Sequence, residues 1–199
     1  MKRSPTSPER SARSEARKTL SREAWIAAAI AALEKKGIAN VKIDHLSKQL
    51  KVTRGSFYFH FRNLKDLLDS LLEEWRQRNC KPFEALIDQE VIDGPAFFDA
   101  VTGVWIREDP FSPRLDLAIR DWARGSAVIA RKVQAQDDFR MALLVRAFAA
   151  MGYDQDESLI RARITYFQQI GYYATHFKEP PADRKRFRSL YTKILIGSD

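Results

Sequence analysis

The chain has 199 residues, of which 45% are hydrophobic, and a formal net charge of +8. This apolar content excludes an intrinsically disordered protein, and the length allows one large domain or two smaller ones. The longest apolar run, residues 24–33, is too short to cross a membrane. The amino terminus has no secretion-type apolar segment, and a single cysteine, Cys80, excludes an internal disulfide. We therefore expect a cytoplasmic protein with no membrane contact, metal or cofactor.

The positive charge is concentrated in the amino-terminal part of the chain. Residues 1–80 contain 17 Lys and Arg against 9 Asp and Glu, whereas residues 81–199 contain 17 of each kind. A basic segment joined to a neutral one is the pattern expected when one part of a protein meets a polyphosphate. The distribution predicts a nucleic-acid-binding module within the first 80 residues.

Residues 1–20 are rich in Ser, Pro, Arg and Glu and have no apolar periodicity, so we predict a disordered basic tail. Two interpretations stay open for this tail. It is either a solvated segment or a basic arm that touches phosphate or enters a minor groove. Glu9, Glu15 and the lack of an amphipathic face argue against a mitochondrial presequence.

Four helices are predicted from residue 21 to residue 79. Ser21 can cap a helix that ends at Gly37, and helices over about 43–50 and 53–60 follow, separated by a three-residue turn. A longer helix over 63–79 has leucines at helical spacing, and Asn63 with Asp66 resembles a capping box. Short helices followed by a long one are typical of a helix-turn-helix domain joined to a second domain.

The segment VTRGSFYFHF, residues 52–61, carries the strongest functional signal. Phe57 and Phe61 are four residues apart and can both enter a core, which leaves Tyr58 and His60 facing outward with Arg54. Thr53 can cap the helix with its hydroxyl, and a first turn with little side-chain bulk can bring backbone amides close to a phosphate. An exposed Arg, Tyr and His surface on the second of two short helices suits a DNA major groove.

Beyond Pro82 the chain is predicted to be helical near 82–90, 95–106, 113–124, 126–151, 155–177 and 182–196. Breaks are expected at Gly94-Pro95, residues 109–113, Gly152 and Pro180-Pro181. No alternating strand pattern of useful length occurs. The expected fold class is therefore all-α.

From about residue 21 to residue 76 the chain resembles the TetR family of transcriptional regulators, most specifically in VTRGSFYFHF, the following Asn63 and the leucine-rich helix. The phrases LAIRDWA (residues 117–123) and IGYYA (residues 170–174) are similar to those of some family members. The resemblance implies a homodimer. Each subunit would have a helix-turn-helix DNA-binding domain over residues 21–80 and a helical effector-binding and dimerisation domain over residues 81–199.

The resemblance also implies which residues meet DNA, although the chain departs from the family pattern at three points. Val41 and Lys42 replace a hydroxyl cap, Lys51 replaces the turn glycine and so requires a positive φ, and Leu64 replaces a phosphate-binding lysine. Lys65 or Arg62 could supply that last contact. The predicted DNA-binding residues are Lys42, Thr53, Arg54, Gly55, Ser56, Tyr58, Phe59, His60 and Lys65.

Aromatic residues are frequent in the second half of the chain. Each one could simply pack in a core, but together they could line a cavity for a small apolar or aromatic effector. The candidates for this site are Trp105, Trp122, Phe139 and Tyr166. Asp137 and Arg140 could contact such a ligand, but their i,i+3 spacing favours an ion pair on a helix surface.

The helix predicted over 155–177 is apolar on two sides, which indicates two partners: its own bundle and a second subunit. Burial of both sides in one large core is the alternative. The predicted homodimer interface consists of Ile160, Ile164, Phe167, Gly171 and Ala174 from this helix, with Phe187, Leu190, Tyr191 and Ile194 from the last one.

An enzymatic function is not expected, because no pair of the three histidines has metal-ligand spacing and Cys80 has no recognisable base partner. The favoured function is a ligand-responsive repressor that binds a pseudo-palindromic double-stranded DNA operator as a dimer. Two alternatives stay open. One is a sequence-nonspecific or architectural DNA-binding protein, and the other is a ligand-binding or catalytic bundle with a vestigial DNA module.

Overall fold

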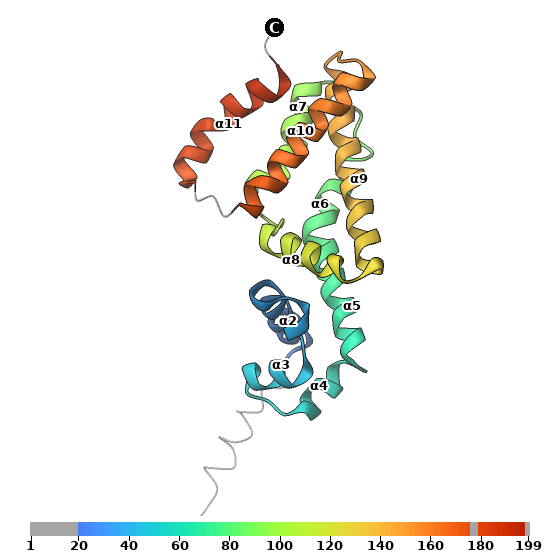
Figure 1. Ribbon diagram of the computed structural model, residues 1–199, viewed down its shortest axis with the longest axis vertical. Helices are drawn as coiled ribbons and strands as arrows, with labels where there is room; N and C mark the ends of the chain where they lie inside the picture. Colours follow the sequence, from blue (N-terminus) through green and yellow to red (C-terminus); the bar gives the residue numbers. More distant parts are fainter. Residues whose placement is uncertain (1–19, 176–178, 198–199) are drawn as a thin grey trace, which may run out of the picture. The chain divides into compact units, whose positions relative to one another are not determined.

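The structure is a computed structural model that describes residues 20–175 and 179–197, without the side chains of residues 181, 184 and 185 (Figure 1). It is 80% helical, and no strand occurs in the described ranges. The predicted all-α fold class is therefore confirmed. The predicted disordered tail falls almost wholly outside the described residues.

Contacts divide the chain into two compact units, Met1–Leu72 and Glu73–Asp199. The division falls inside one helix, α5 (Leu64–Trp75), which begins in the first unit and ends in the second. The predicted domain boundary at residue 80 lies eight residues further along the chain, at the end of the helical segment that continues α5.

The amino-terminal unit contains α2 (Arg22–Lys36), the 3-10 turn η1 (Ile38–Asn40), α3 (Ile43–Leu50), α4 (Arg54–His60) and the start of α5. The hydroxyl of Ser21 accepts from the amide of Ala24 at 3.3 Å and caps α2, as predicted. Gly37 ends this helix with φ 75°, and its amide donates to the carbonyl of Leu33. Both ends of α2 are therefore set by the residues that the sequence indicated.

One small aromatic core joins the helices of this unit. Phe57 from α4 and the adjacent Phe61 are fully buried, and their ring centroids lie 5.3 Å apart. The ring of Trp25 from α2 meets Phe57 edge to face, also at 5.3 Å. The predicted inward positions of Phe57 and Phe61 are thus confirmed, and they fix which face of α4 is free.

The carboxyl-terminal unit begins with a local change in helix type. After Trp75 the predicted continuous helix becomes the π-helical turn η2 (Arg76–Cys80), in which the amide of Lys81 donates to the carbonyl of Arg76 five residues earlier. Pro82 has no amide hydrogen to continue an α-helical ladder across this point. The predicted helix over 82–90 is also shorter than expected, because α6 covers only Lys81–Glu84 and turns follow it.

The remaining helices agree closely with the predicted ranges. They are α7 (Gly94–Arg107), α8 (Pro113–Arg124), α9 (Ala127–Ala150), α10 (Gln155–Ala174) and α11 (Pro181–Ile196). None of the helices in the described residues is both long and apolar enough to cross a membrane.

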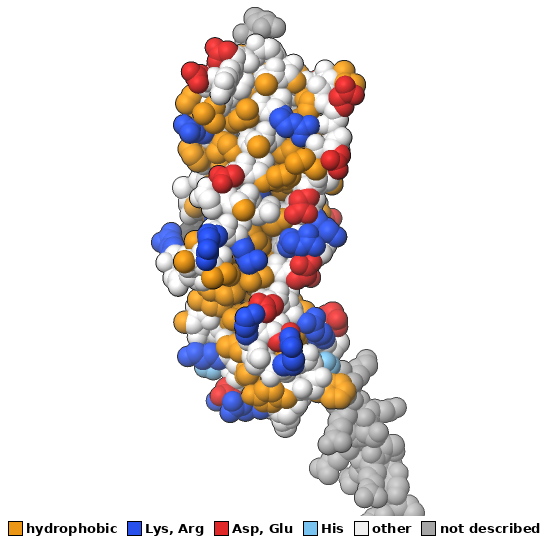
Figure 2. Space-filling model, turned by 90° about the vertical axis from the view of Figure 1, so that its right-hand side faces the viewer, with side chains coloured by type: hydrophobic (Ala, Val, Ile, Leu, Met, Phe, Trp, Pro, Cys, Tyr) orange, Lys and Arg blue, Asp and Glu red, His pale blue; other side chains and the backbone are white. Residues whose placement is uncertain are grey.

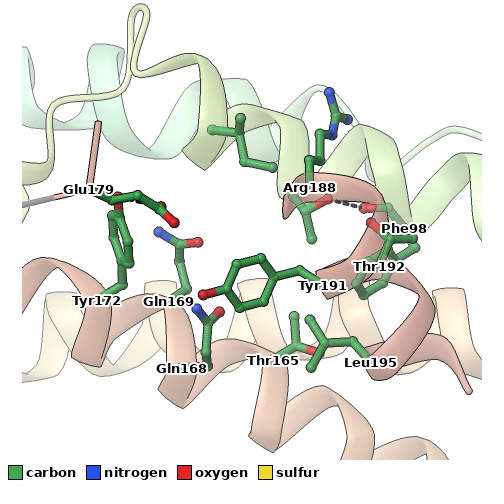
Figure 3. A pocket seen from close by; sticks show the side chains of 12 residues that line it. Phe98, Thr165, Gln168, Gln169, Tyr172, Glu179, Arg188, Tyr191, Thr192 and Leu195 are labelled. Carbon is green, nitrogen blue, oxygen red and sulfur yellow. Dashed lines mark hydrogen bonds between the residues drawn. The ribbon is translucent and has the colours of Figure 1, made fainter. Parts of the chain in front are cut away.

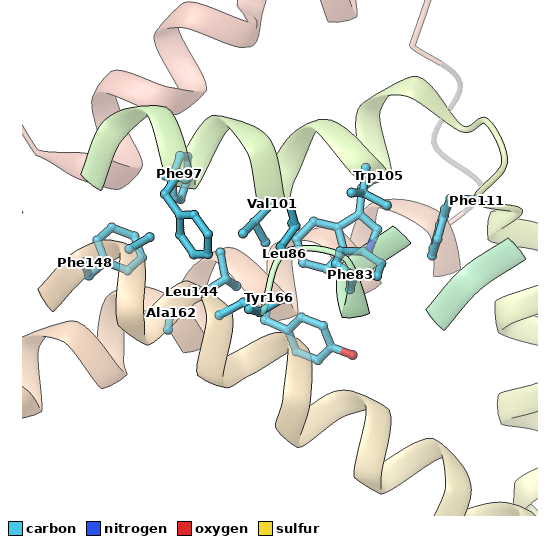
Figure 4. Close-up of a cluster of buried hydrophobic side chains, with 14 residues drawn as sticks. Phe83, Leu86, Phe97, Val101, Trp105, Phe111, Leu144, Phe148, Ala162 and Tyr166 are labelled. Carbon is cyan, nitrogen blue, oxygen red and sulfur yellow. The ribbon is translucent and has the colours of Figure 1, made fainter. Parts of the chain in front are cut away.

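An aromatic-rich core fills the space between α6, α7, α9 and α10 (Figure 4). Trp105 from α7 stacks at a tilt against Phe83 from α6, with ring centroids 5.0 Å apart, and lies 5.9 Å from Tyr166 of α10. Phe148 from α9 packs on Phe98 from α7 at 5.4 Å. Large aromatic side chains therefore take up the interior of this bundle.

A buried ion pair lies beside that core. Arg140 of α9 has no solvent-exposed surface, and it donates to Asp116 of α8 at 3.3 and 3.4 Å and to the backbone carbonyl of Asn79 at 2.8 Å. The indole of Trp75 donates to Asp116 at 3.1 Å, and Arg120 adds a further bond at 3.1 Å. Burial raises the pKa of the Asp116 carboxyl, but Arg140 and Arg120 outweigh it and hold this pKa below its usual value.

The predicted surface ion pair between Asp137 and Arg140 is wrong. Asp137 instead accepts two hydrogen bonds from Arg120 at 2.6 and 2.8 Å, and a third from the hydroxyl of Tyr166 at 2.6 Å. Burial raises the pKa of Tyr166 to about 12, so this phenol stays protonated and can donate. Helix α8 supplies the partners that the spacing within α9 could not show.

The carboxyl end of α11 is attached to α10 and to the segment before it through backbone carbonyls. Arg161 donates to the carbonyl of Leu195 at 3.1 Å, and the hydroxyl of Tyr153 donates to the carbonyl of Ile196. Gly197 follows with φ 81°, and a Cβ at this position would lie 2.8 Å from the Tyr153 hydroxyl. These donors satisfy carbonyls that a helix end otherwise leaves unpaired.

Candidate nucleic-acid interface

The turn between α3 and α4 depends on Lys51. This residue has φ 57°, as predicted for the position where the family pattern has glycine. Its amide donates to the carbonyl of Lys48, and the amide of Val52 donates to the carbonyl of Ser47 at 3.0 Å. The left-handed residue closes the end of α3 and lets α4 begin three residues later, which is helix-turn-helix geometry.

Helix α4 has one buried face and one open face. Phe57 is fully buried, whereas Tyr58 is 55% exposed and Phe59 is 78% exposed. The rings of Phe59 and His60 meet edge to face at 5.2 Å. The structure therefore brings Tyr58, Phe59 and His60 together on one helix, with two large aromatic rings open to solvent.

The first turn of α4 differs in one detail from the prediction. Thr53 takes the N-cap position with extended backbone, but its hydroxyl makes no capping hydrogen bond, so the predicted side-chain cap is wrong. The amide of Ser56 donates to the Thr53 carbonyl instead, at 3.1 Å. Among the described residues, a Cβ added to the exposed Gly55 would meet only the Thr53 hydroxyl, at 3.6 Å, so the fold has room for a side chain there.

Carboxylates accompany three of the basic side chains of this surface. Arg54 pairs with Asp44 of α3 at 3.0 Å, and this partner was missed because it precedes Arg54 by ten residues across the turn. Lys65 pairs with Asp69 at 2.6 Å within α5. The charged groups of both pairs are more than half exposed, and such ion pairs contribute little stability and can exchange partners.

The start of α5 supplies a third pair. The Asn63 side chain accepts from the amide of Asp66 at 3.0 Å, which is half of the predicted capping box. The Asp66 carboxylate accepts from the backbone and side chain of Arg62 rather than from the Asn63 amide. These bonds, led by the one from the Arg62 amide, lower the pKa of Asp66. Arg62 is thus held just before α5 by Asp66, with its side chain exposed.

The surface chemistry of the unit is mixed rather than uniformly basic. On the face shown in Figure 2, Lys and Arg side chains lie among hydrophobic and acidic ones over the amino-terminal helices. Lys42 is exposed at the N-cap of α3 and makes no capping hydrogen bond there. A mixed surface of this kind offers cations to phosphates and apolar groups to bases.

Comparison with known proteins identifies this domain. Residues 26–71 match the family model described as bacterial regulatory proteins, tetR family. This domain belongs to the TetR family. The match covers α2, α3, α4 and most of α5, so the amino-terminal unit is the helix-turn-helix domain of that family.

Among the proteins similar to this chain are one curated relative and two solved structures. The transcriptional regulator AcuR of Cereibacter sphaeroides is 34% identical over 76 residues, which span 38% of this chain and a third (33%) of the relative. A structure described as BioQ with its natural double-stranded DNA operator is 21% identical and covers 88% of this chain and 92% of its own, with a TM-score of 0.39. A TetR variant from Acinetobacter baumannii AYE in complex with minocycline is 19% identical and covers 89% and 94%, also at 0.39.

TetR-family proteins are a class of transcriptional regulators that is generally non-enzymatic. In the described part of this member, no cluster of three His, Cys, Asp or Glu residues is arranged to hold a metal. Cys80 is fully buried, and burial raises the pKa of its thiol to about 12. A thiol in this environment is not a reactive nucleophile.

The four predicted effector-binding residues lie in different surroundings. Trp105 and Tyr166 are almost completely buried in the aromatic core, and Phe139 packs against that core from its edge. Trp122 is partly exposed near the end of α8. That these side chains line a common pocket stays a prediction; the Trp105 ring lies 5.0 Å from that of Phe83 and 5.9 Å from that of Tyr166.

The predicted dimer residues form an apolar strip open to solvent in the carboxyl-terminal unit. Ile160, Ile164 and Phe167 of α10 are each about half exposed or more, as are Leu190 and Ile194 of α11. Ala174 is exposed, Gly171 and Phe187 are partly exposed, and Tyr191 also borders a hollow between these helices. A Cβ added to Gly171 would meet no atom within 4 Å. No residue within the described ranges covers this strip.

Proposed function

We propose that this TetR-family protein is a sequence-specific, ligand-responsive repressor that binds a pseudo-palindromic operator as a homodimer. The observation that supports DNA reading most directly is the exposure of Tyr58 and Phe59 on α4. Rings left in water contribute little to folding, and neither is needed to complete the core that Phe57 and Phe61 fill. In a major groove they can contact thymine methyl groups, and the Tyr58 hydroxyl can bond phosphate.

The charged groups support phosphate binding at the edges of that contact. Lys42, Arg62 and Lys65 are exposed at helix starts, and Arg54 can leave Asp44 for a phosphate or a guanine because the ion pair is largely solvated. Each neutralised phosphate adds to the salt dependence of the affinity. The proposed contacts are the nine DNA-binding residues predicted from the sequence, together with Arg62.

The exposed strip on α10 and α11 supports the homodimer. Several large apolar side chains exposed on two helices are typical of an interaction site. A two-fold dimer presents two copies of α4, and these require two related half-sites in the DNA. A small molecule would regulate binding only by favouring one dimer geometry over another.

The decisive experiment is selection of duplexes from a random library by the full chain, followed by fluorescence anisotropy with the selected sequence. Specific binding predicts an enriched inverted repeat and at least a thousandfold preference over random DNA at physiological salt. An enrichment with no repeat and no preference would contradict the proposal. It would favour sequence-nonspecific binding. The ion pair between Arg54 and Asp44 is compatible with that alternative too, because Arg54 held by Asp44 would not read a base.

Three variants locate the contact on α4. Tyr58→Ala should weaken operator binding at least tenfold with unchanged helical content, whereas Ile92→Ala, an apolar truncation at a still more exposed position in the other unit, should not change it. Gly55→Ala should leave folding intact, because its Cβ has room, but should weaken binding if backbone approaches DNA at this point. Unchanged affinity in both α4 variants would place the DNA elsewhere.

A further inference from the structure

A hollow opens between α7, α10 and α11 and borders the aromatic core at Phe98, although none of the four predicted effector residues lines it. It is open to solvent, and its lining combines apolar with polar side chains, as small-molecule sites do. Figure 3 shows that its lining is divided into two ends. Phe98 and Leu195 lie at one end with Thr165, while Gln169, Tyr172 and Glu179 lie at the other.

The polar end contains an unsatisfied group. Gln169 is only 9% exposed, and its side-chain nitrogen Nε2 has no hydrogen-bond partner among the described residues. A buried amide group without a partner is unfavourable and points to a missing one. The Tyr172 hydroxyl, beside it, donates to the Glu179 carboxylate at 3.2 Å, and that carboxylate can accept a further bond.

The charges of the lining restrict the head group of an occupant. A carboxylate head would be repelled by Glu179, while an ammonium head would offer no acceptor to Gln169 Nε2. Arg188 borders the other end, but its guanidinium is 3.8 Å from Asp99 and points away from the polar end in Figure 3. A neutral group that both donates and accepts meets both requirements, and it does so for either orientation of the Gln169 amide.

We propose that this hollow binds a small neutral amphiphile, with a carboxamide or hydroxyl head against Gln169 and Glu179 and a short apolar tail toward Phe98 and Leu195. This inference rests on the proposed ligand-responsive function for its regulatory consequence. Helix α11 connects the hollow with the proposed dimer surface, because Leu195 borders the hollow while Leu190 and Ile194 belong to the exposed strip.

Calorimetric titration of the full chain with three six-carbon probes tests the head group directly. Hexanamide, hexanoate and hexylammonium share one tail and differ in charge. The neutral amide should bind at least tenfold more tightly than either ion. Equal affinities, tighter binding of an ion, or no binding of hexanamide at millimolar concentration would each overturn the inference.

Two variants place the binding in this hollow. Gln169→Leu should weaken hexanamide binding at least tenfold, and Gln155→Leu, on an exposed position of the same helix, should leave it unchanged. Glu179→Gln should increase the affinity for hexanoate at least tenfold, a gain that a misfolded protein could not show. Equal effects of the two glutamine variants, or no gain for hexanoate, would contradict the assignment.

A parallel titration with the selected operator separates this inference from the proposed function. If hexanamide binds with the expected preference but leaves operator affinity unchanged, the proposed ligand class is supported, and the proposal that this hollow regulates repression is refuted. If operator binding is specific and hexanamide does not bind, the repressor stands and the ligand class is wrong.

Discussion

Replacement of Arg140 by methionine would test the role of the buried ion pair in holding the carboxyl-terminal unit together. Methionine keeps an unbranched apolar stem between the rings of Phe83 and Phe111, which lie 4.9 and 5.7 Å from the guanidinium carbon. The substitution removes the charge and three hydrogen bonds, two to Asp116 and one to the carbonyl of Asn79. Asp116 then remains as a buried carboxylate with one cationic partner fewer.

The expected loss in the free energy of unfolding depends on the hydrogen bonds that Asp116 retains. Breaking a buried pair by removing one partner costs about 3–5 kcal/mol. Asp116 retains the bonds from Arg120 and from the Trp75 indole, both at 3.1 Å, so the lower end of that range, about 3 kcal/mol, is expected. In a protein of this size such a loss lowers the thermal midpoint by roughly 6–12 °C.

Urea unfolding followed by tryptophan fluorescence and by circular dichroism would measure this change. Arg131→Met, at an exposed position of the same helix, serves as the control and should cost less than about 0.5 kcal/mol. The double variant Asp116→Leu with Arg140→Met removes both charges and should lose less than the sum of the single losses. A loss below about 1 kcal/mol for Arg140→Met would refute the view that this pair holds the helices together.

Three further outcomes are expected. Lys51→Gly should stabilise the helix-turn-helix domain by about 0.5–1 kcal/mol in urea unfolding, because glycine adopts φ 57° without steric cost; a destabilised variant would show that the turn is not strained. Asp116 has a depressed folded-state pKa, so its stabilisation is present above the unfolded pKa of about 3.9 and is lost as pH falls through the folded value. Asp116→Asn should therefore flatten the acid limb of an unfolding curve, and an unchanged limb would assign that limb to other groups. Gly171→Arg should give monomers in sedimentation with intact helical content. Persistent dimers would show that the interface lies elsewhere.

The amino-terminal domain was largely predictable from the sequence because its determinants are local. The four-residue spacing of Phe57 and Phe61 fixed the buried face of α4, and the three-residue turn required a left-handed residue even where lysine replaces glycine. The Thr53 hydroxyl cap was wrong because Thr53 satisfies the Ser56 amide with its backbone carbonyl instead. Capping choices of this kind depend on geometry that a residue pattern leaves open.

The carboxyl-terminal unit was less predictable because its important contacts join distant helices. Arg140 and Asp137 have the spacing of a surface pair, yet each finds its partner on α8, which no pattern within α9 could show. Trp105 and Tyr166 are predicted to line a cavity because large aromatics can do so, but no pattern in the sequence shows that their two rings pack against each other. The hollow beside Gln169 depends on how α10 and α11 pack, and the sequence offered no local signal for it.

The attachment of the last helix has a consequence for how this end of the chain tolerates change. Arg161 and Tyr153 donate hydrogen bonds to main-chain oxygens, which every amino acid supplies. Replacing the side chain of Leu195 or Ile196 therefore leaves both hydrogen bonds in place. A one-residue insertion or deletion between them and the bundle would instead move the oxygens out of reach. At Gly197 any larger residue would collide with the Tyr153 hydroxyl. The number of residues that precede positions 195 and 196, rather than the side chains at these positions, should therefore decide whether the two hydrogen bonds form.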